Sequence, residues 1–258
     1  MVEGPTARLY AIKIARSCRD QHIKKVYVKS LKRVYIPVSS LIGEKIEDTD
    51  TIGKNILLLT GRYCIRIHLM MYGSIHIYEL NEDFKKPSKM IRLLIETDSK
   101  KIVVYNAPIV EIDYRDRLVG RLLKEYGPDP LRSDWDRNEA IRRILNNGWR
   151  KIGEVLLDQS VIAGIGNILR NEILFRAGIH PERLVSQLSR DEVKKIVDVA
   201  ERLTREFLRI KLDGGRLKPI LYVYNRYNEK CKICGSPIKF YIQKEVGRKT
   251  FVCEKCQR

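Results

Sequence analysis

Two pairs of cysteines near the end of the sequence constrain the fold more than any other feature. Cys231 and Cys234 form one Cys-x-x-Cys pair, Cys253 and Cys256 form a second, and eighteen residues separate the pairs. This spacing is typical of a tetrahedral zinc site, whereas two unrelated pairs of free thiols are the alternative. Four thiolates leave no open position on the ion, so we expect one structural Zn²⁺ that takes no part in catalysis.

The segment between the cysteine pairs has the pattern of a β-hairpin. Strand-like runs at residues 238–242 and 250–252 flank a turn that contains Gly247. We therefore expect a hairpin that the metal holds at its base. Arg248 and Lys249 would lie at its tip, where basic side chains could contact the phosphates of a nucleic acid.

The charge balance points to a polyanionic partner. The chain has 258 residues, with 50 Lys plus Arg against 32 Asp plus Glu, and a formal net charge of +18. Such an excess predicts binding that weakens with salt. A solvated basic surface is the alternative, as is heavy use of charge for heat resistance, but the latter raises acids and bases together. The sequence has no long apolar run and no secretion signal, so we expect an intracellular protein without membrane contact.

A helix followed by a run of short strands is expected in the first half of the chain. Residues 4–19 have apolar and basic positions at helical spacing, and Pro5 occupies an early position that a helix tolerates. Residues 20–115 form an all-β unit, which we expect to be two packed sheets or a flattened barrel. Its strands are expected at residues 23–38, 56–60, 63–70, 74–78, 90–96 and 101–105.

A rigid connector separates this unit from a helical region. Gly127, Pro128 and Pro130 lie within four residues and cannot continue a helix. We therefore expect an α+β multidomain fold. Its parts are an N-terminal β-sandwich with a leading helix over residues 1–124, a linker over 125–133, a helical domain over 134–220 and a zinc finger over 221–258. Helices are expected at residues 136–146, 152–158, 167–176 and 191–210.

The first residues of the chain suit nucleophilic chemistry. Met1 precedes a small residue, so we expect its removal, which leaves Val2 with a free α-amine. Such an amine titrates near ~7.8 and is far less protonated at neutral pH than a lysine side chain. It can attack a sugar carbon and form a Schiff base, and Glu3 beside it can transfer a proton. An ordinary frayed chain end is the alternative.

Two turns inside the β unit contain further candidates. Lys54 follows Gly53 before an apolar strand, where it could reach a phosphate or a reacting sugar, or be a solvated turn lysine. If Met1 is retained, Lys54 is the alternative amine. Met71 lies in the turn after the strand that ends near His68. If it is buried it fills the core, and if it is exposed it can act as an apolar wedge that replaces an extruded base.

A glycine-containing turn joins two helices in the second half of the chain. Gly164 and Gly166 allow the backbone to approach another molecule closely. Asn167 opens the next helix, whose first N–H groups favour an anion such as phosphate. The alternative is a plain helix–turn–helix corner in which Asn167 is the N-cap.

Three stretches of the sequence resemble the formamidopyrimidine-DNA glycosylase / endonuclease VIII (Fpg/Nei) family. Residues 157–181 look like its helix–two-turns–helix element, and residues 127–131 are similar to its interdomain linker. The start Val2-Glu3-Gly4-Pro5 resembles its N-terminus, where the first residue of the mature chain is the nucleophile. The resemblance is weakest in the β unit.

The resemblance implies roles for individual residues. Val2 would be the Schiff-base amine, Glu3 the general acid/base, and Lys54 a further residue of the catalytic site that contacts phosphate. The remaining matches are expected to take part in DNA binding, with Met71 as the wedge and Glu172 as an acid on the second helix: Asn167, Arg248, Met71 and Glu172.

The sequence departs from the family pattern at three places. Val2 replaces the usual proline, as in one Nei-like subgroup, and Thr6 replaces a common acid. Residues 105–113 lack the Arg-Arg-Phe wedge of the enzymes that act on 8-oxoguanine. This difference argues against a specialist for 8-oxoguanine and implies that the strand opposite the lesion is held loosely.

The resemblance implies a bifunctional DNA glycosylase/AP lyase of base excision repair. We expect a monomer that acts on damaged double- or single-stranded DNA, removes oxidised pyrimidines or hydantoins, and cleaves the abasic site by β- or β,δ-elimination. The alternative is a catalytically silent zinc-finger paralogue that binds DNA or RNA. A zinc-ribbon RNA-binding protein would explain the charge and the cysteines, but neither residues 2–5 nor residues 157–181.

Overall fold

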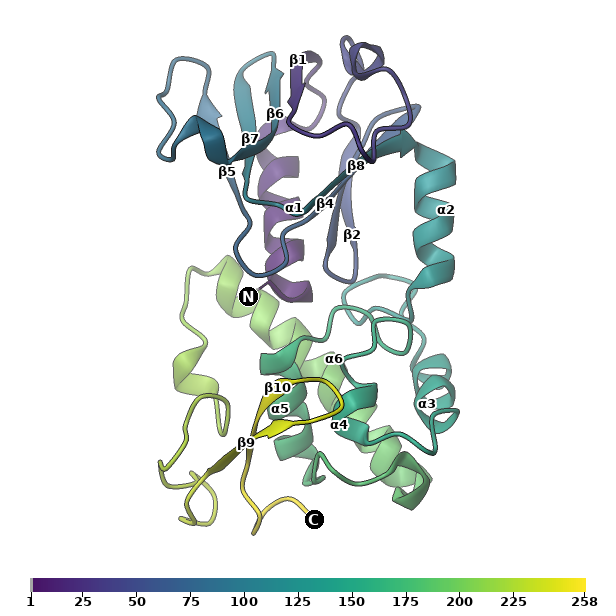
Figure 1. Ribbon diagram of the computed structural model, residues 1–258, viewed down its shortest axis with the longest axis vertical. Coiled ribbons are helices and arrows are strands. Elements are labelled where there is room, and N and C mark those ends of the chain that lie inside the picture. The colour runs from purple at the N-terminus through teal and green to yellow at the C-terminus, as the bar shows by residue number, and fades with distance from the viewer. Residues whose placement is uncertain (1) are drawn as a thin grey trace. The chain divides into compact units, whose positions relative to one another are not determined.

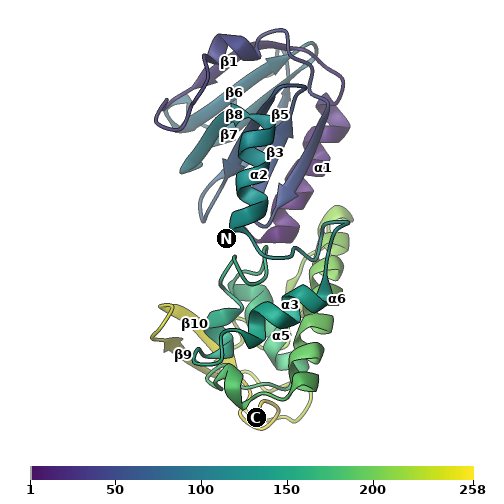
Figure 2. The ribbon, with the colours of Figure 1, turned by 90° about the vertical axis from the view of Figure 1, so that its right-hand side faces the viewer.

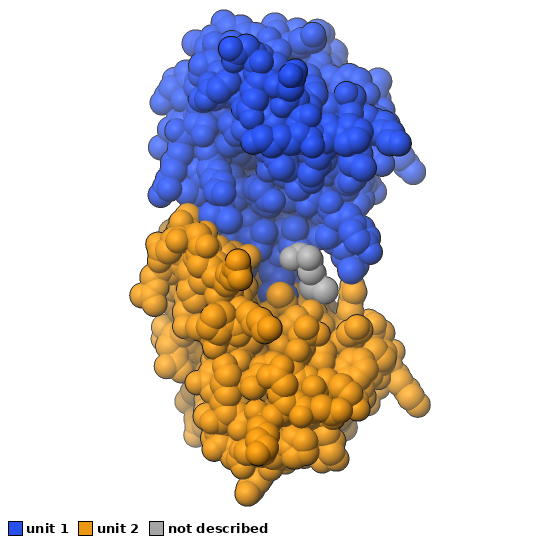
Figure 3. All heavy atoms as spheres, turned by 90° about the vertical axis from the view of Figure 1, so that its left-hand side faces the viewer, with its two compact units in different colours: residues 1–125 blue, residues 126–258 orange. Residues whose placement is uncertain are grey.

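The computed structural model of the chain describes residues 2–258, and the chain divides into two compact units, residues 1–125 and residues 126–258 (Figure 3). The expected removal of Met1 concerns a residue outside the described part of the chain. No helix within residues 2–258 combines the length and the apolar character that a membrane span requires.

Unit 1 is a β-sandwich of two four-stranded antiparallel sheets (Figures 1 and 2). One sheet has the strand order β1-β6-β7-β5, and the other has the order β2-β3-β4-β8. Apolar side chains from both sheets, among them Ile65 and Ile95, form one fully buried core. The strands are β1 (Ile23–Val28), β2 (Asp48–Ile52), β3 (Asn55–Leu59), β4 (Tyr63–His68), β5 (Ser74–Glu79), β6 (Ile91–Thr97), β7 (Lys100–Tyr105) and β8 (Ile109–Tyr114).

Two helices pack on this sandwich. Helix α1 (Gly4–Cys18) has Pro5 in its first turn and buries Ala7, Ala11 and Ile14 in the core of the sandwich. The Thr49 hydroxyl donates to the carbonyl oxygen of Ala11 at 2.7 Å, which ties α1 to β2. Figure 2 shows α1 running beside β3. Helix α2 (Arg115–Glu125) follows β8, and short 3-10 helices lie at Val38–Leu41 and Ser88–Met90.

Unit 2 is helical and ends in a β-hairpin. Its longest helix, α6, starts with a capping box in which the Ser189 hydroxyl accepts from the Glu192 N–H. Apolar side chains of α3, α5 and α6 share one core. The elements are α3 (Arg137–Leu145), α4 (Ile152–Val155), α5 (Asn167–Ala177), η3 (Val185–Gln187), α6 (Arg190–Leu212), η4 (Lys218–Ile220), β9 (Lys239–Gln243) and β10 (Arg248–Val252).

The expected α+β fold, with two packed sheets, a helical region and a terminal hairpin, is confirmed, but parts of the predicted pattern are wrong. The predicted β-like run over residues 23–38 is a strand only as far as Val28. Beyond it, Val34 forms only an isolated parallel bridge with Ile112, and Pro37 then precedes a 3-10 helix. Apart from the short 3-10 helices, three elements are missing from the prediction: β2, β8 and α2.

Candidate functional site

The backbone nitrogen of Val2 is held at the turn that follows β4. It donates to the carbonyl oxygen of Met70 at 3.1 Å, and the Met70 N–H donates to Nδ1 of His68 at 3.3 Å. The turn is tight, because a Cβ added at Gly73 would lie 2.6 Å from the carbonyl oxygen of Leu69. Met70 itself adopts a left-handed conformation with φ 47°. The position of the Val2 nitrogen is therefore set by the folded turn.

Glu3 lies at the start of α1 and is almost fully buried, with 4% of its surface exposed. Its carbonyl oxygen accepts the N–H groups of Thr6 and Ala7, which closes the first helical turn. Gly4 and Pro5 are buried as well. A carboxyl group is thereby fixed next in sequence to the Val2 nitrogen, in surroundings that hold little water.

Lys54 and His68 come together through strand pairing. Gly53 and Lys54 form the two-residue turn between β2 and β3, and Gly53 has φ 60°, which favours glycine. The next residue, Asn55, pairs with His68 across β3 and β4. Burial, with the charges of Arg66 and Lys54, lowers the pKa of His68 to about 4. The imidazole is therefore neutral at neutral pH. His68 could not be predicted as a site residue, because only the strand register brings it near Lys54.

A buried polar network supports this corner of the sheet. Arg66 donates through Nε to Asn55 at 2.8 Å and through Nη1 to Glu111 at 2.8 Å. Arg121 on α2 donates to the other carboxylate oxygen of Glu111. A buried polar network is rigid only when its polar groups have hydrogen-bond partners. Because each of these contacts is present, the network holds β3, β4 and β8 in position.

The structure decides between the two alternatives for Met71. Its side chain is 48% exposed and lies outside the core, so Met71 is not a core filler. Met70 and Tyr72 beside it are exposed as well. The turn therefore presents apolar side chains to solvent.

In unit 2, helix α5 and the β-hairpin are joined at one carbonyl oxygen. The Lys249 carbonyl accepts from Asn167 at 2.9 Å, from Arg170 at 3.1 Å and from Asn171 at 3.5 Å. Asn171 also accepts the N–H of Phe251 at 2.7 Å. The hairpin is therefore fastened to the helix that the glycine turn introduces.

Arg170 contributes most to this junction, although it was not among the residues predicted from the sequence. Its side chain is fully buried, and Nη1 donates to Gln243 while Nη2 donates to Thr250, both at 2.7 Å. Burial lowers its pKa to about 10. Within residues 2–258 it pairs with no carboxylate, so neutral oxygens of the hairpin hold the charge. An arginine among apolar residues of a helix is the signal that could have identified it.

Asn167 does not have the alternative role of an N-cap. Gly166 occupies that position, and Asn167 is the first residue of α5, with 4% of its surface exposed. Its amide nitrogen is directed to Lys249, and its Oδ1 is buried without a hydrogen-bond partner among the described residues. In this arrangement the side chain fastens the hairpin.

Glu172, for which the resemblance implied a part in DNA binding, lies inside unit 2. Its carboxylate is fully buried and accepts the N–H groups of Tyr222, Val223 and Tyr224 at 2.9 to 3.0 Å. Arg176 donates to it at 2.9 Å. All acceptor positions face the protein, so Glu172 is a positioning residue that anchors the segment leading to the cysteines.

Arg248 is exposed at the start of β10, opposite Gln243. Gly247 before it has φ 59°, which allows the reversal of the chain. Since the next residue, Lys249, is fixed through its carbonyl, the hairpin presents the Arg248 side chain from an anchored strand.

The four cysteines predicted as ligands are brought together. Their sulfur atoms all lie within 4.8 Å of one another, and this cluster could hold a metal ion. Cys231 and Cys256 are 3.8 Å apart and Cys234 and Cys253 are 3.4 Å apart. A tetrahedral ion with metal–sulfur bonds of about 2.3 Å requires sulfur–sulfur distances of about 3.8 Å. The donor set and its geometry therefore fit a tetrahedral thiolate site.

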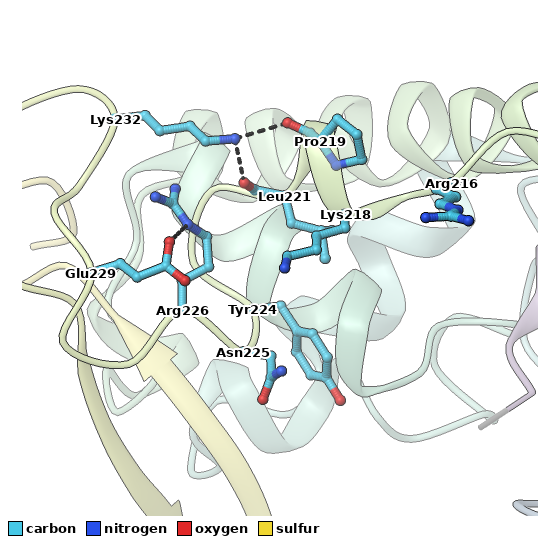
Figure 4. Close-up of a pocket in the computed structure, with 9 residues that line it drawn as sticks. All are labelled: Arg216, Lys218, Pro219, Leu221, Tyr224, Asn225, Arg226, Glu229 and Lys232. Atoms are coloured by element: carbon cyan, nitrogen blue, oxygen red, sulfur yellow. Dashed lines mark hydrogen bonds and ion pairs between the residues drawn. The ribbon is translucent and has the colours of Figure 1, made fainter.

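A cavity of about 610 Å³ lies between η4 and the first cysteine pair (Figure 4). Lys232 donates to the carbonyl oxygens of Pro219 and Leu221, each at 2.8 Å, and holds one wall in place. Arg226 and Glu229 pair at 2.8 Å on another side. The remaining lining includes an aromatic ring, an amide and two basic side chains: Tyr224, Asn225, Arg216 and Lys218.

Comparison with known proteins identifies related sequences and structures. The model of the formamidopyrimidine-DNA glycosylase N-terminal domain matches residues 1–108, and that of the formamidopyrimidine-DNA glycosylase H2TH domain matches residues 126–218. A probable endonuclease 8 2 of Streptomyces coelicolor is 30% identical, over 94% of this chain and 90% of its own. A formamidopyrimidine-DNA glycosylase of Oceanobacillus iheyensis is also 30% identical, over 83% and 80%.

Solved structures of the Fpg protein of Lactococcus lactis have the same fold. The complex with DNA that contains N7-benzyl-Fapy-dG has a TM-score of 0.87 at 23% identity and covers 99% of both chains. The complex with DNA that contains an abasic site has a TM-score of 0.87 at 22% identity, again over 99% of both chains.

Proposed function

Because the chain belongs to the formamidopyrimidine-DNA glycosylase / endonuclease VIII family, we propose that it is a DNA glycosylase of base excision repair that also cleaves the abasic site. The observation that carries the proposal is the Val2 nitrogen, held 3.1 Å from the Met70 carbonyl oxygen beside the buried Glu3. Once Met1 is removed, this nitrogen is a primary amine in a fixed position.

The amine of Val2 is the proposed nucleophile. Its lone pair forms a bond to C1′ of the damaged nucleotide, while the bond from C1′ to the base breaks and the base leaves with that electron pair and a proton. The nitrogen loses one proton, the C1′–O4′ bond breaks, and O4′ takes up a proton. The product is a protonated imine between Val2 and C1′.

Glu3 is the proposed proton donor to O4′ and the acceptor in the following step. Loss of a proton from C2′ then breaks the C3′–O bond, and the 3′ phosphate leaves by β-elimination. A second elimination at C5′ would give the β,δ product. The hydrogen bond between the Val2 nitrogen and the Met70 carbonyl oxygen supports this mechanism, because the carbonyl can orient the amine.

Basic side chains in both units are proposed to hold the phosphates. Lys54 lies near the neutral His68, and Arg248 is exposed on the anchored hairpin. Asn167 would add a contact through the amide hydrogen that Lys249 does not take. Met71, exposed on its turn, would fill the place of the extruded nucleotide. The metal in the cysteine cluster is proposed to be Zn²⁺, held by Cys231, Cys234, Cys253 and Cys256 for structure alone.

We also propose a preference for oxidised pyrimidines or hydantoins. Residues 105–113 contain no Arg-Arg-Phe wedge, and the turn into β8 contains Ala107 and Pro108 instead. The cavity between η4 and the cysteines is within the ~300–1,000 Å³ range of small-ligand sites and could take part in holding a base. A comparison of excision rates on oxidised purine, pyrimidine, hydantoin and abasic substrates, single- and double-stranded, tests this preference.

Borohydride trapping tests the proposed nucleophile. Wild-type protein with Met1 removed should form a covalent adduct with lesion DNA when borohydride reduces the imine. Val2→Leu should block removal of Met1 and abolish the adduct, whereas Val2→Pro permits removal and keeps an amine that forms it. Mass spectrometry of the N-terminus verifies the processing of each variant.

Two results would contradict the proposal. An adduct that persists in Val2→Leu and disappears in Lys54→Met would transfer the chemistry to Lys54. DNA binding without any adduct or cleavage across the substrate panel would favour the catalytically silent paralogue.

A further inference from the structure

A second cavity, of about 200 Å³, lies in unit 1, and all of its charged lining residues are basic. Its charged lining consists of Lys32, Arg33 and Arg92, and it has no acidic side chain. Ser30 adds a hydroxyl group. The remaining wall is the turn that leads into β8, where Ala107 and Pro108 lie.

The cavity lies at the same end of the sheet as the turn that holds Val2. One edge of β8 contacts the segment of Arg33, whose carbonyl oxygen accepts the Ile112 N–H at 2.9 Å. The other edge of β8 pairs with β4, with Ile109 opposite His68. The cavity wall therefore lies on β8, and the neighbouring strand β4 ends at His68, just before the turn that holds Val2.

Arg92 projects from β6 with unsatisfied hydrogen-bonding capacity. Its Nε is buried and has no hydrogen-bond partner, and its guanidinium makes no hydrogen bond or ion pair with any residue in 2–258. Buried polar groups are normally paired, because an unpaired donor away from water costs about 1–3 kcal/mol. The site is thus incomplete in the protein alone.

Lys32 and Arg33 add to this imbalance. Both are exposed at the rim, and neither side chain pairs with a carboxylate in the described part of the chain. Three positive charges around one small cavity repel one another, and a bound anion would relieve that repulsion. The cavity is too small for a base with its sugar, but its exposed rim would admit a phosphate group that is part of a longer chain.

We propose that Lys32, Arg33 and Arg92 form an accessory site for one backbone phosphate of the nucleic acid. The inference rests on the proposed function, because it takes DNA as the partner. It adds a contact on unit 1 that is distinct from Lys54 and that uses the turn where the Arg-Arg-Phe wedge is absent. Such a contact positions the nucleic acid without reading its sequence.

Salt dependence of DNA binding tests the site. The triple variant Lys32→Gln/Arg33→Gln/Arg92→Gln is compared with Arg16→Gln/Lys25→Gln/Lys124→Gln, which removes the same charge from exposed positions of unit 1. The slope of log K against log salt should fall by about 0.9 for one lost phosphate contact in the site variant. The control should change it by much less. Lys32→Gln/Arg33→Gln, which leaves the half-buried Arg92 in place, should give an intermediate loss if the triple variant folds poorly.

An NMR titration identifies the occupant. The Nε–Hε signal of Arg92 should shift when an undamaged duplex is added, at concentrations where wild-type protein binds it. A shift with inorganic phosphate alone, and none with the duplex, would overturn the assignment to nucleic acid. Equal slopes for the site and control variants would overturn the site itself. Both results are distinguishable from failure of the proposed function, because wild-type protein would still form the borohydride adduct.

Discussion

The side-chain amide of Asn167 donates to the carbonyl oxygen of Lys249 at 2.9 Å, across more than eighty positions of sequence. This bond joins the first residue of α5 to the strand that presents Arg248. Two residues proposed to contact phosphate are therefore coupled through the backbone of a third. A change at Asn167 should alter the hairpin as well as its own contact.

Asn167→Asp should weaken DNA binding by at least about tenfold, since each lost charge-assisted contact is worth roughly 1.5–3 kcal/mol. The carboxylate cannot donate to Lys249 and would repel both that carbonyl and a phosphate. Titration of lesion-containing duplex at fixed salt measures the effect. Asn138→Asp, exposed in the first turn of α3, introduces the same charge and should bind within about twofold of wild type. Equal losses in the two variants would contradict the coupling.

Arg170→Met should lower the free energy of unfolding of unit 2 by about 3 kcal/mol, because the buried oxygens of Gln243 and Thr250 lose the Arg170 donor and the Lys249 carbonyl loses one of its three donors. Urea denaturation measures the change. Arg205→Met removes an exposed arginine that pairs with Glu201, and should cost less than about 1 kcal/mol. A stable Arg170→Met variant would show that packing alone holds the hairpin.

Unit 1 should lose stability as the pH falls from about 6.5 to about 4. The pKa of His68 is lowered to about 4 by burial, with the charges of Arg66 and Lys54 adding to it, whereas the unfolded chain binds the proton near ~6.5. Between these values only the unfolded form is protonated, so acid favours unfolding, by at most about 1.4 kcal/mol per pH unit. His68→Gln should flatten this part of the pH profile. NMR titration of the imidazole checks the premise, and a midpoint at or above 6.5 would refute it.

Removal of the metal should disorder the hairpin and weaken DNA binding. We expect one zinc ion per chain by elemental analysis, released by a strong chelator together with loss of β10 protection in hydrogen exchange. Cys234→Ser should bind less than one ion, whereas Cys18→Ser, at a buried cysteine outside the cluster, should keep the full content. A metal content unchanged in Cys234→Ser would exclude the four-thiolate site.

Much of the fold could be predicted from the sequence where local pattern and environment agree. The cysteine spacing, the helix after Pro5 and the helix after Ser189 are examples, because each depends on residues close in sequence. Strand β8 was not predicted from the sequence, and the reason is physical. Glu111 and Asp113 lie on the face opposite the core residue Ile112, buried against arginines, so the strand lacks the apolar and exposed polar alternation of a typical strand.

Strand β2 was not predicted for a similar reason. Its sequence alternates Asp and Thr, and reads as a polar turn region, yet Thr49 and Thr51 are buried. Thr49 reaches the backbone of α1, a contact that no local pattern reveals. The site residues that were missed, His68 and Arg170, share this property, since long-range pairing alone gives them their surroundings.

The anchoring of residues 222–224 by Glu172 has a consequence for how such a protein can change. Helix α6 ends at Leu212, and the chain is clamped again ten residues later. Changes between these two points would leave the Glu172 anchor in place, but those near Pro219 and Leu221 would also affect the segment of the first cysteine pair, because Lys232 donates to both carbonyl oxygens. The intervening stretch forms part of the wall of the cavity in Figure 4, so changes in its length would reshape that cavity while the buried core of unit 2 keeps its packing.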